Sequence, residues 1–125
     1  DASLQPDGEH QILLPQYRLC LARFIAKVRQ LGDTRMIWAT STPLYWPEPE
    51  KPMAEWSIKK QAEIEEYNAA ALAIVMDEGL PVNDLNDVIV RNDFTKCISE
   101  DGCHMTEFGN EVLSDAVATA IATPV

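Results

Sequence analysis

Hydrophobic residues along the chain recur mostly at helical spacing. Within residues 17–31, 64–75 and 108–121 they fall three or four positions apart, so each stretch places them on one face of a helix. The sequence therefore predicts three amphipathic helices. The apolar faces comprise Tyr17, Leu21, Phe24, Ile25, Val28 and Leu31 in the first, Ile64, Tyr67, Ala71, Leu72 and Val75 in the second, and Phe108, Val112, Leu113, Ala116, Val117, Ala120 and Ile121 in the third.

Residues that favour helix ends flank these three stretches. Pro15 suits the first turn of the first helix, and Gly32 follows its last apolar residue. Ser57 is a candidate N-cap for the second helix and Gly79 its candidate end, while Thr106 is a good N-cap for the third. Capping residues and apolar periodicity thus predict the same helices.

Two short apolar runs lie between the helices. Residues 36–40 are apolar at almost every position and end at Ser-Thr-Pro, which predicts a strand buried on both faces, as in parallel sheets. Residues 81–85 predict a second short strand. Residues 86–103 are expected to be mostly loop, with one turn of helix near 88–90.

The predicted elements alternate along the chain as helix, strand, helix, strand, helix. This order is typical of a parallel α/β sheet with helices on its faces. With 125 residues the chain has the length of one domain. Two strands, however, offer three amphipathic helices too little sheet to cover. We therefore expect an α/β fold whose sheet needs more strands than these residues supply.

Two segments lack a helical or strand pattern. Residues 1–11 are polar and turn-like. Residues 43–56 interleave prolines with Tyr45, Trp46 and Trp56. These aromatic side chains either cover the core as a lid or form a platform for a sugar or acyl group.

The net charge narrows the classes of partner. Twenty acidic and 10 basic residues give a formal charge of −10. Such a surface repels phosphate groups, so nucleic acids and anionic membranes are not expected as partners. No apolar run approaches the ~20 residues that span a bilayer, and the first residues lack the basic and apolar regions of a signal peptide. Because the chain starts with Asp1, we expect a processed or truncated N-terminus.

The three cysteines leave alternatives open. A local disulfide between Cys97 and Cys103 would stabilise the fold by about 2–3 kcal/mol on the loop-entropy model. It would also indicate an oxidising compartment, and hence a secreted or periplasmic protein. Alternatively all three thiols are reduced, with Cys20 as a small core residue. A zinc site of Cys97, Cys103 and His104 lacks a fourth ligand at the usual spacing.

Asp101 and His104 form the strongest chemical pattern in the chain. A histidine that acts as a general base must be held in one tautomer, and a carboxylate bound to one ring nitrogen does this. Gly102 allows the tight turn that brings two residues three positions apart together. The pair lies just before the cap of the last helix, at the end of the sheet where ligands bind in open α/β folds.

The surroundings of this pair resemble a known superfamily. Residues 101–109 read DGCHMTEFG and precede an amphipathic helix, which closely resembles the D-G-x-H-x-[TS]-x-x-G block of the SGNH/GDSL hydrolases. Residues 36–43 resemble the penultimate strand of esterase-like members, and residues 66–70 leading to 81–85 form a third similar segment. The three segments follow the superfamily's order and spacing and extend over nearly the whole chain.

The resemblance implies a three-layer α/β/α, flavodoxin-like fold and a Ser-His-Asp active site that needs no metal or organic cofactor. It makes His104 the general base and Asp101 its orienting partner. The superfamily's G-D-S-[LIV] nucleophile block and its oxyanion-hole glycine and asparagine blocks are not found in this sequence. Residues 1–125 therefore resemble the C-terminal portion of one SGNH hydrolase domain, whose N-terminal strands lie outside the chain.

A serine within the chain could replace the missing nucleophile only in the right geometry. Ser41, at the end of a predicted strand, is the best candidate, but it lacks a nucleophile elbow and a following helix N-terminus. A hydroxyl that satisfies local backbone groups is the simpler interpretation of Ser41. Asp84 is likewise interpreted as a structural residue at a strand end.

These observations predict an ester hydrolase, with carbohydrate O-acetyl esters as a candidate substrate class. Its nucleophile would come from an upstream segment or a second chain, and these 125 residues alone would be inactive. The alternative is a non-catalytic binding or structural protein derived from a hydrolase fold.

Overall fold

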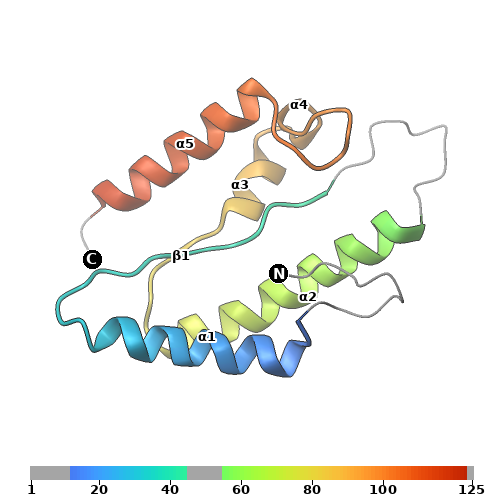
Figure 1. Ribbon diagram of the computed structural model, residues 1–125. Coiled ribbons are helices and arrows are strands. Elements are labelled where there is room, and N and C mark those ends of the chain that lie inside the picture. The colour runs from blue at the N-terminus through green and yellow to red at the C-terminus, as the bar shows by residue number, and fades with distance from the viewer. Residues whose placement is uncertain (1–11, 45–54, 124–125) are drawn as a thin grey trace.

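The computed structural model describes residues 12–44 and 55–123, without the side chains of 55–57. This described part contains five helices and two strands (Figure 1). They are α1 (Leu14–Arg29), β1 (Trp38–Ala39), α2 (Glu55–Asp77), β2 (Val82–Asn83), α3 (Leu85–Arg91), α4 (Phe94–Cys97) and α5 (Glu107–Ala122).

The two strands pair in parallel, with Trp38 opposite Val82 and Ala39 opposite Asn83. The backbone amide of Trp38 donates to the carbonyl of Pro81 at 3.0 Å. The amide of Thr40 donates to the carbonyl of Asn83 at 3.2 Å. A small parallel sheet with helices around it confirms the predicted α/β class.

Helices cover both faces of this sheet (Figure 1). On one face α1 packs on α2, and their buried residues meet Trp38 and Val82. On the other face α5 packs on α3 and α4. Two separate cores result, one of Leu21, Ile25, Ala71 and Val75, the other of Ile89, Cys97 and Ile98.

The direction of α5 decides where the last loop lies. Arg35, just before β1, donates from its guanidinium to the carbonyls of Ala120 at 3.0 Å and Ile121 at 2.6 Å. The positive charge of the guanidinium stabilises the C-terminus of α5, where the partial charge of the last carbonyls is negative. Since the end of α5 lies beside the start of β1, its N-terminus lies toward the carboxyl ends of both strands (Figure 1).

Helix ends agree with the sequence patterns except at the start of α2. Pro15 lies in the first turn of α1, which ends at Arg29, and Gly32 follows with a φ of +93°. Gly79 has a φ of +72° and ends α2. The amide of the leucine that follows it donates to the carbonyl of Val75 at 2.9 Å. The prediction of Ser57 as N-cap is wrong, because α2 begins at Glu55.

Both strands are shorter than predicted. Residues 86–103, predicted to be mostly loop with one turn of helix near 88–90, contain most of α3, in which that turn lies, and also α4. The strand at 36–40 is not buried on both faces, because Ala39 is exposed. In the described part of the chain only β2 pairs with β1. Residues 85–91 are helical because Asp84 accepts a hydrogen bond from the amide of Asp87 at 3.1 Å. One and two turns of helix are too short for apolar periodicity to reveal.

The expectations for residues 1–11 and for Tyr45 and Trp46 lie outside the described residues, as does the side chain of Trp56. Among the helices that the structure describes, none is both long and apolar enough to cross a membrane.

Candidate active site

The loop between α4 and α5 is a tight hairpin. Ile98 and Met105 form an antiparallel bridge, and the amide of Ser99 donates to the carbonyl of His104 at 2.8 Å. At its tip the amide of Gly102 donates to the carbonyl of Ser99 at 2.9 Å. Gly102 has a φ of +77°, a conformation that glycine adopts without strain. The hairpin therefore brings Asp101 and His104 to the same side of one turn.

The Asp101 carboxylate organises this turn. Its Oδ2 lies 2.5 Å from Nδ1 of His104. Its Oδ1 accepts hydrogen bonds from the Ser99 hydroxyl at 2.7 Å and from the backbone amides of Cys103 and His104 at 2.8 and 2.9 Å. The structure thus brings together the two residues that the sequence pattern singled out.

These hydrogen bonds also set the charge of the pair. The amide of Cys103, followed by the ring and the amide of His104 and the hydroxyl of Ser99, holds the pKa of Asp101 well below its usual range. Asp101 is therefore an anion throughout the neutral and mildly acidic range. An anion at Nδ1 fixes that nitrogen as the donor and leaves Nε2 to accept a proton.

The hairpin is anchored by the start of α5. The Thr106 hydroxyl caps α5 by accepting from the amide of Gly109 at 3.1 Å, and it donates to the carbonyl of Lys96 at 2.6 Å. Gly109 is buried against α4, and a Cβ there would lie 2.2 Å from the carbonyl oxygen of Cys97. The Thr-x-x-Gly spacing therefore clamps α5 onto α4 directly behind His104.

A second set of polar contacts holds the segment after β1. Asn68 of α2 accepts from the amide of Ser41 and donates to its carbonyl, both at 2.9 Å. The Thr40 hydroxyl donates to Asp84 at 2.8 Å and accepts from the amide of Asn86 at 3.0 Å. No local sequence pattern marks the two asparagines as functional, although Asn68 stands in the Glu66-Tyr67-Asn68 segment. Asp84 is structural, as predicted from its position at a strand end.

The sequence and the structure were compared with those of known proteins. No protein-family model matches the sequence, and no curated protein matches it either. Solved structures do match. The esterase domain of the ORF1 protein of the zebrafish ZfL2-1 retrotransposon superposes with a TM-score of 0.70 at 17% identity, over 94% of this chain and 63% of that one.

Two further hydrolases match similarly. A lipase/acylhydrolase from Enterococcus faecalis gives a TM-score of 0.68 at 24% identity, over 90% of this chain and 53% of that one. LAE5, an alpha/beta hydrolase from the metagenome of Lake Arreo, Spain, gives a TM-score of 0.66 at 20% identity, over 94% of this chain and 50% of that one. The chain has the α/β fold of these hydrolase structures. It spans between about half and two thirds of the length of these structures.

None of the serines whose side chains the structure describes forms a hydrogen bond with the ring of His104. The hydroxyl of Ser99 is directed to Asp101. Ser41 is exposed at the end of β1, where Asn68 and Asn86 bind its backbone. Within residues 12–44 and 58–123, no hydrogen bond joins a serine hydroxyl to the histidine ring. The side chain of His104 is 83% exposed, so its Nε2 faces open space.

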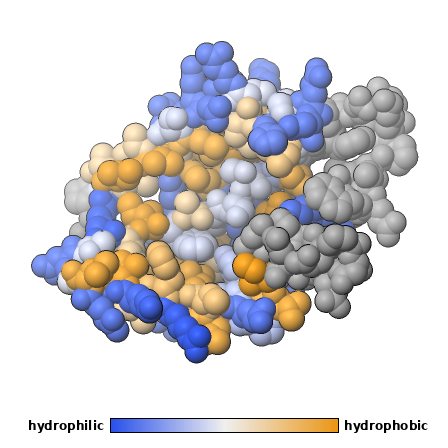
Figure 2. All heavy atoms as spheres, viewed as in Figure 1, coloured by the Kyte–Doolittle hydropathy of each residue, from blue (hydrophilic) through white to orange (hydrophobic). Residues whose placement is uncertain are grey.

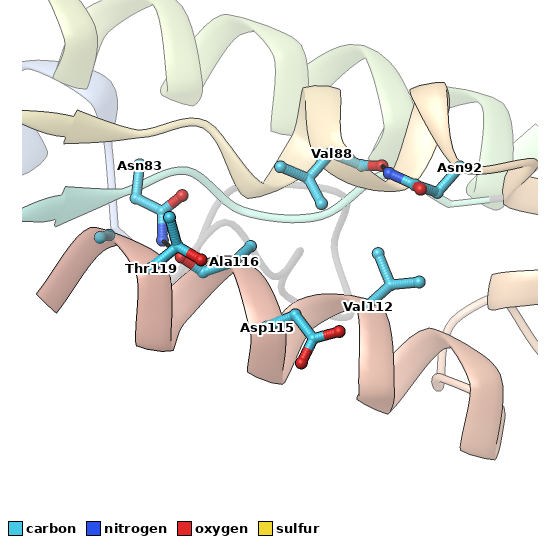
Figure 3. Close-up of a pocket in the computed structure, with 8 residues that line it drawn as sticks. Asn83, Val88, Asn92, Val112, Asp115, Ala116 and Thr119 are labelled. Carbon is cyan, nitrogen blue, oxygen red and sulfur yellow. Dashed lines mark hydrogen bonds between the residues drawn. The ribbon is translucent and has the colours of Figure 1, made fainter. Parts of the chain in front are cut away.

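A groove of the described residues lies away from the hairpin. It has a volume of about 460 Å³ and runs between α5 and the segment of β2 and α3 (Figure 3). Neither Asp101 nor His104 lines it, so the candidate site is the exposed hairpin and not this groove. Its walls comprise Asn83, Val88 and Asn92 on one side and Val112, Asp115, Ala116, Thr119 and Ala120 of α5 on the other.

The predicted Cys97–Cys103 disulfide is wrong, because both thiols are free. Cys97 points into the core under α5 and its Sγ contacts the carbonyl of Asn92 at 3.4 Å, whereas Cys103 is exposed at the hairpin tip. Cys20 is exposed, not a core residue. No group of three or more metal-binding side chains occurs in the described part of the chain. The cysteines therefore give the predicted secreted or periplasmic location no support.

Thiol reactivity should reflect this arrangement. We expect two thiols, Cys20 and Cys103, to react rapidly with Ellman's reagent in the native protein. Cys97 should react only on unfolding, because it is fully buried and burial raises its pKa. A Cys103→Ser variant should lose one rapidly reacting thiol. A single reactive thiol in the unreduced, unfolded protein would instead indicate a Cys97–Cys103 bond.

The charge on Asp101 gives a pH prediction. Because the folded-state pKa of this carboxyl is lowered, its contribution to stability is fully present above the ordinary value of about 3.9. That contribution is lost only as the pH falls through the lower folded value. In ¹³C NMR titrations, the Asp101 carboxyl carbon should stay unchanged where the same carbon in a peptide of residues 99–104 titrates. Coincident midpoints would contradict the hydrogen-bond network.

Proposed function

We propose that this chain supplies the Asp-His part of a serine ester hydrolase. In this proposal His104 is the general base, Asp101 orients it, and the nucleophilic serine lies outside these 125 residues. The observation that carries the proposal is the 2.5 Å contact between Nδ1 of His104 and Oδ2 of Asp101. Its position at the start of α5 in an SGNH-like fold supports the same conclusion.

The proposed reaction is acyl transfer to water. Nε2 of His104 removes the proton from the serine hydroxyl as the oxygen attacks the ester carbonyl. The imidazolium then gives that proton to the leaving alcohol, and a water molecule, activated in the same way, releases the acid from the acyl-enzyme. Asp101 stabilises the imidazolium, because its own low pKa keeps it charged during both steps.

The exposure of His104 is consistent with a site that another segment completes. A general base must lie within hydrogen-bond reach of its nucleophile, and an oxyanion hole needs donors about 3 Å from the developing charge. The described residues place no serine hydroxyl at Nε2 of His104. We therefore propose that an upstream segment or a second chain provides the serine and the oxyanion donors.

For the substrate we propose acetyl esters of saccharides. The support is the resemblance of residues 36–43 to esterase-like members of the superfamily. Release of acetate from an acetylated xylan should exceed hydrolysis of nitrophenyl octanoate by the native hydrolase. The opposite order would indicate a lipase-like preference and leave the hydrolase proposal intact.

Labelling with a fluorophosphonate probe tests the proposal. The native protein that contains this chain should bind the probe covalently at a serine outside residues 1–125, and His104→Ala should prevent the labelling. The isolated 125-residue chain should neither be labelled nor hydrolyse nitrophenyl acetate. A native protein that the probe does not label would favour a non-catalytic binding protein built on a hydrolase fold.

A further inference from the structure

We propose that the groove between α5 and the segment of β2 and α3 binds a neutral oligosaccharide. The inference rests on the proposed function only where it makes this sugar chain a part of the substrate, since the binding itself needs no catalysis. The groove has a volume of about 460 Å³ and is separate from the hairpin (Figure 3). This volume lies within the range of small-molecule sites, about 300–1,000 Å³.

Small apolar side chains form the floor of the groove. Val88 of α3 and Val112 of α5 point into it from opposite sides (Figure 3). Ala116 and Ala120 continue this surface along α5. These side chains leave the space between the helices open, and they can pack against C–H groups of a ligand. The floor therefore suits the C–H face of a sugar ring.

Two amides line one wall of the groove. Nδ2 of Asn83 donates to the carbonyl of Ala116 at 3.4 Å, and Nδ2 of Asn92 donates to the carbonyl of Val88 at 2.7 Å. Each amide keeps its Oδ1 and its second N–H proton for a further partner. Because the backbone carbonyls already hold both side chains in place, a ligand would lose little affinity to their ordering.

The other wall offers a carboxylate and a hydroxyl. Asp115 and Thr119 lie one turn apart on α5. Among the described residues, no hydrogen bond or ion pair engages either side chain. The groove thus presents acceptors and donors on both walls around an apolar floor. Hydroxyl groups both donate and accept hydrogen bonds, so a ring that carries hydroxyl and C–H groups matches the walls and the floor together.

The charge around the groove disfavours acidic ligands. Glu107, Glu111 and Asp115 are the charged residues of α5, and all three are acidic. Figure 2 shows hydrophilic residues over α5 and the hairpin at the top of the molecule. Among the described residues, no basic side chain lines the groove. A phosphate, a sulfate or a uronic acid would be repelled by this negative surface, so the ligand that fits is neutral.

Two further ligand classes do not suit the groove. A long acyl chain would cover the amides of Asn83 and Asn92 without giving them hydrogen bonds, which costs free energy. A divalent cation needs several oxygen ligands, and among the described residues that line the groove only Asp115 offers a carboxylate. A neutral sugar chain is the class that both walls and the floor can bind.

The groove follows α5 away from the proposed active site. Thr106, the cap of α5, comes two residues after His104. With a rise of about 1.5 Å per residue, Val112 lies about 9 Å along the helix from this cap, and Ala120 lies about 21 Å from it. One end of the groove is therefore the nearer to the hairpin. A sugar chain in the groove would continue from an acetylated sugar bound at His104.

Calorimetric titration of the native protein that contains this chain tests the groove. The probes are four neutral tetrasaccharides without O-acetyl groups: xylotetraose, cellotetraose, mannotetraose and chitotetraose in its N-acetyl form. At least one should bind saturably, and it should bind equally to His104→Ala. Asp115→Ala and Thr119→Ala should each weaken that binding about three- to tenfold, the effect of one lost hydrogen bond. Glu111→Ala is the matched control, since this exposed carboxylate lies one turn away and outside the groove.

Side-chain amide signals locate the bound sugar. In ¹H–¹⁵N NMR spectra of the native protein, the NH₂ signals of Asn83 and Asn92 should shift when the binding tetrasaccharide is added. Those of Asn68 and Asn110 should not, because neither residue lines the groove. Tetragalacturonate, an acidic sugar chain, should bind at least about tenfold more weakly than the neutral probe, and Asp115→Ala should reduce this difference.

The outcomes separate this inference from the proposed function. Failure of all four probes to bind would overturn the groove as a sugar site, and so would shifts at Asn68 or Asn110 in place of Asn83 and Asn92, or preferred binding of tetragalacturonate. Serine labelling without sugar binding would leave the hydrolase function standing and refute the groove. Sugar binding in the groove without labelling would support the groove and indicate a saccharide-binding protein that is not an enzyme.

Discussion

Under the proposed function, replacing His104 by alanine in the native protein that contains this chain is expected to lower kcat/KM for an ester by about 10²–10⁴-fold. The reason is chemical: without Nε2 nothing in the hairpin removes the proton from the serine hydroxyl. The fold should be unaffected, because the ring is 83% exposed. Initial rates with nitrophenyl acetate measure the loss, and unchanged circular dichroism shows that the variant is folded.

Replacing Asp101, the residue that orients His104, should lower activity through kcat. Asp101→Asn keeps the size of the side chain and can still accept from the amides of Cys103 and His104, but it cannot stabilise an imidazolium. We expect kcat to fall at least about 10²-fold with little change in KM.

Matched controls are available for both variants. His10→Ala removes the chain's other histidine, and Glu100→Gln removes the exposed charge next to Asp101. Both should retain full activity. Equal activity of His104→Ala and His10→Ala would refute the assignment of His104 as the general base.

Gly109→Ala is expected to destabilise the chain by about 2–3 kcal/mol. The expected sign is unusual, since alanine in a helix interior is normally about 1 kcal/mol more stable than glycine. Here the added Cβ would lie 2.2 Å from the carbonyl oxygen of Cys97 and 2.9 Å from its carbon, both of them backbone atoms that cannot move aside separately. The start of α5 must therefore separate from α4.

Urea unfolding followed by far-ultraviolet circular dichroism measures this change. Asn110→Ala is the matched control, because the neighbouring side chain is exposed and its loss should change the free energy of unfolding by less than about 0.5 kcal/mol. Since the Thr106 cap and the hairpin rest on the same contact, Gly109→Ala should also loosen the hydrogen bonds around Asp101. A stabilising effect of Gly109→Ala would show that α5 does not press on α4.

The contact between Asp101 and His104 could be anticipated from the sequence because it is local. Only Gly102 and Cys103 lie between the two residues, so the hairpin needs no distant element to bring them together. The same holds for the Thr106 cap and for the end of α2 at Gly79, where backbone and side chain bond within one turn. Apolar periodicity likewise revealed α1, α2 and α5, since each is long enough to show a face.

Contacts between distant residues could not be anticipated in this way. The clamp of Asn68 on Ser41 spans 27 positions and that of Thr40 on Asp84 spans 44, and no local pattern marks either partner. The disulfide prediction failed for the same reason. Six positions allow Cys97 and Cys103 to meet, but the packing of α5 on α4 turns Cys97 inward while the hairpin directs Cys103 outward.

The sequence by itself determined the helices, the local caps and the hairpin that joins Asp101 to His104, because hydrogen bonds between near neighbours and the burial of one helix face decide them. Only the tertiary structure decided which surfaces remain open. The edge of β1, the flank of α1 at Phe24 and the flank of α5 at Ile121 look apolar and buried in the sequence pattern, yet they are exposed. Exposure depends on which elements pack together, and that is a property of the assembled fold.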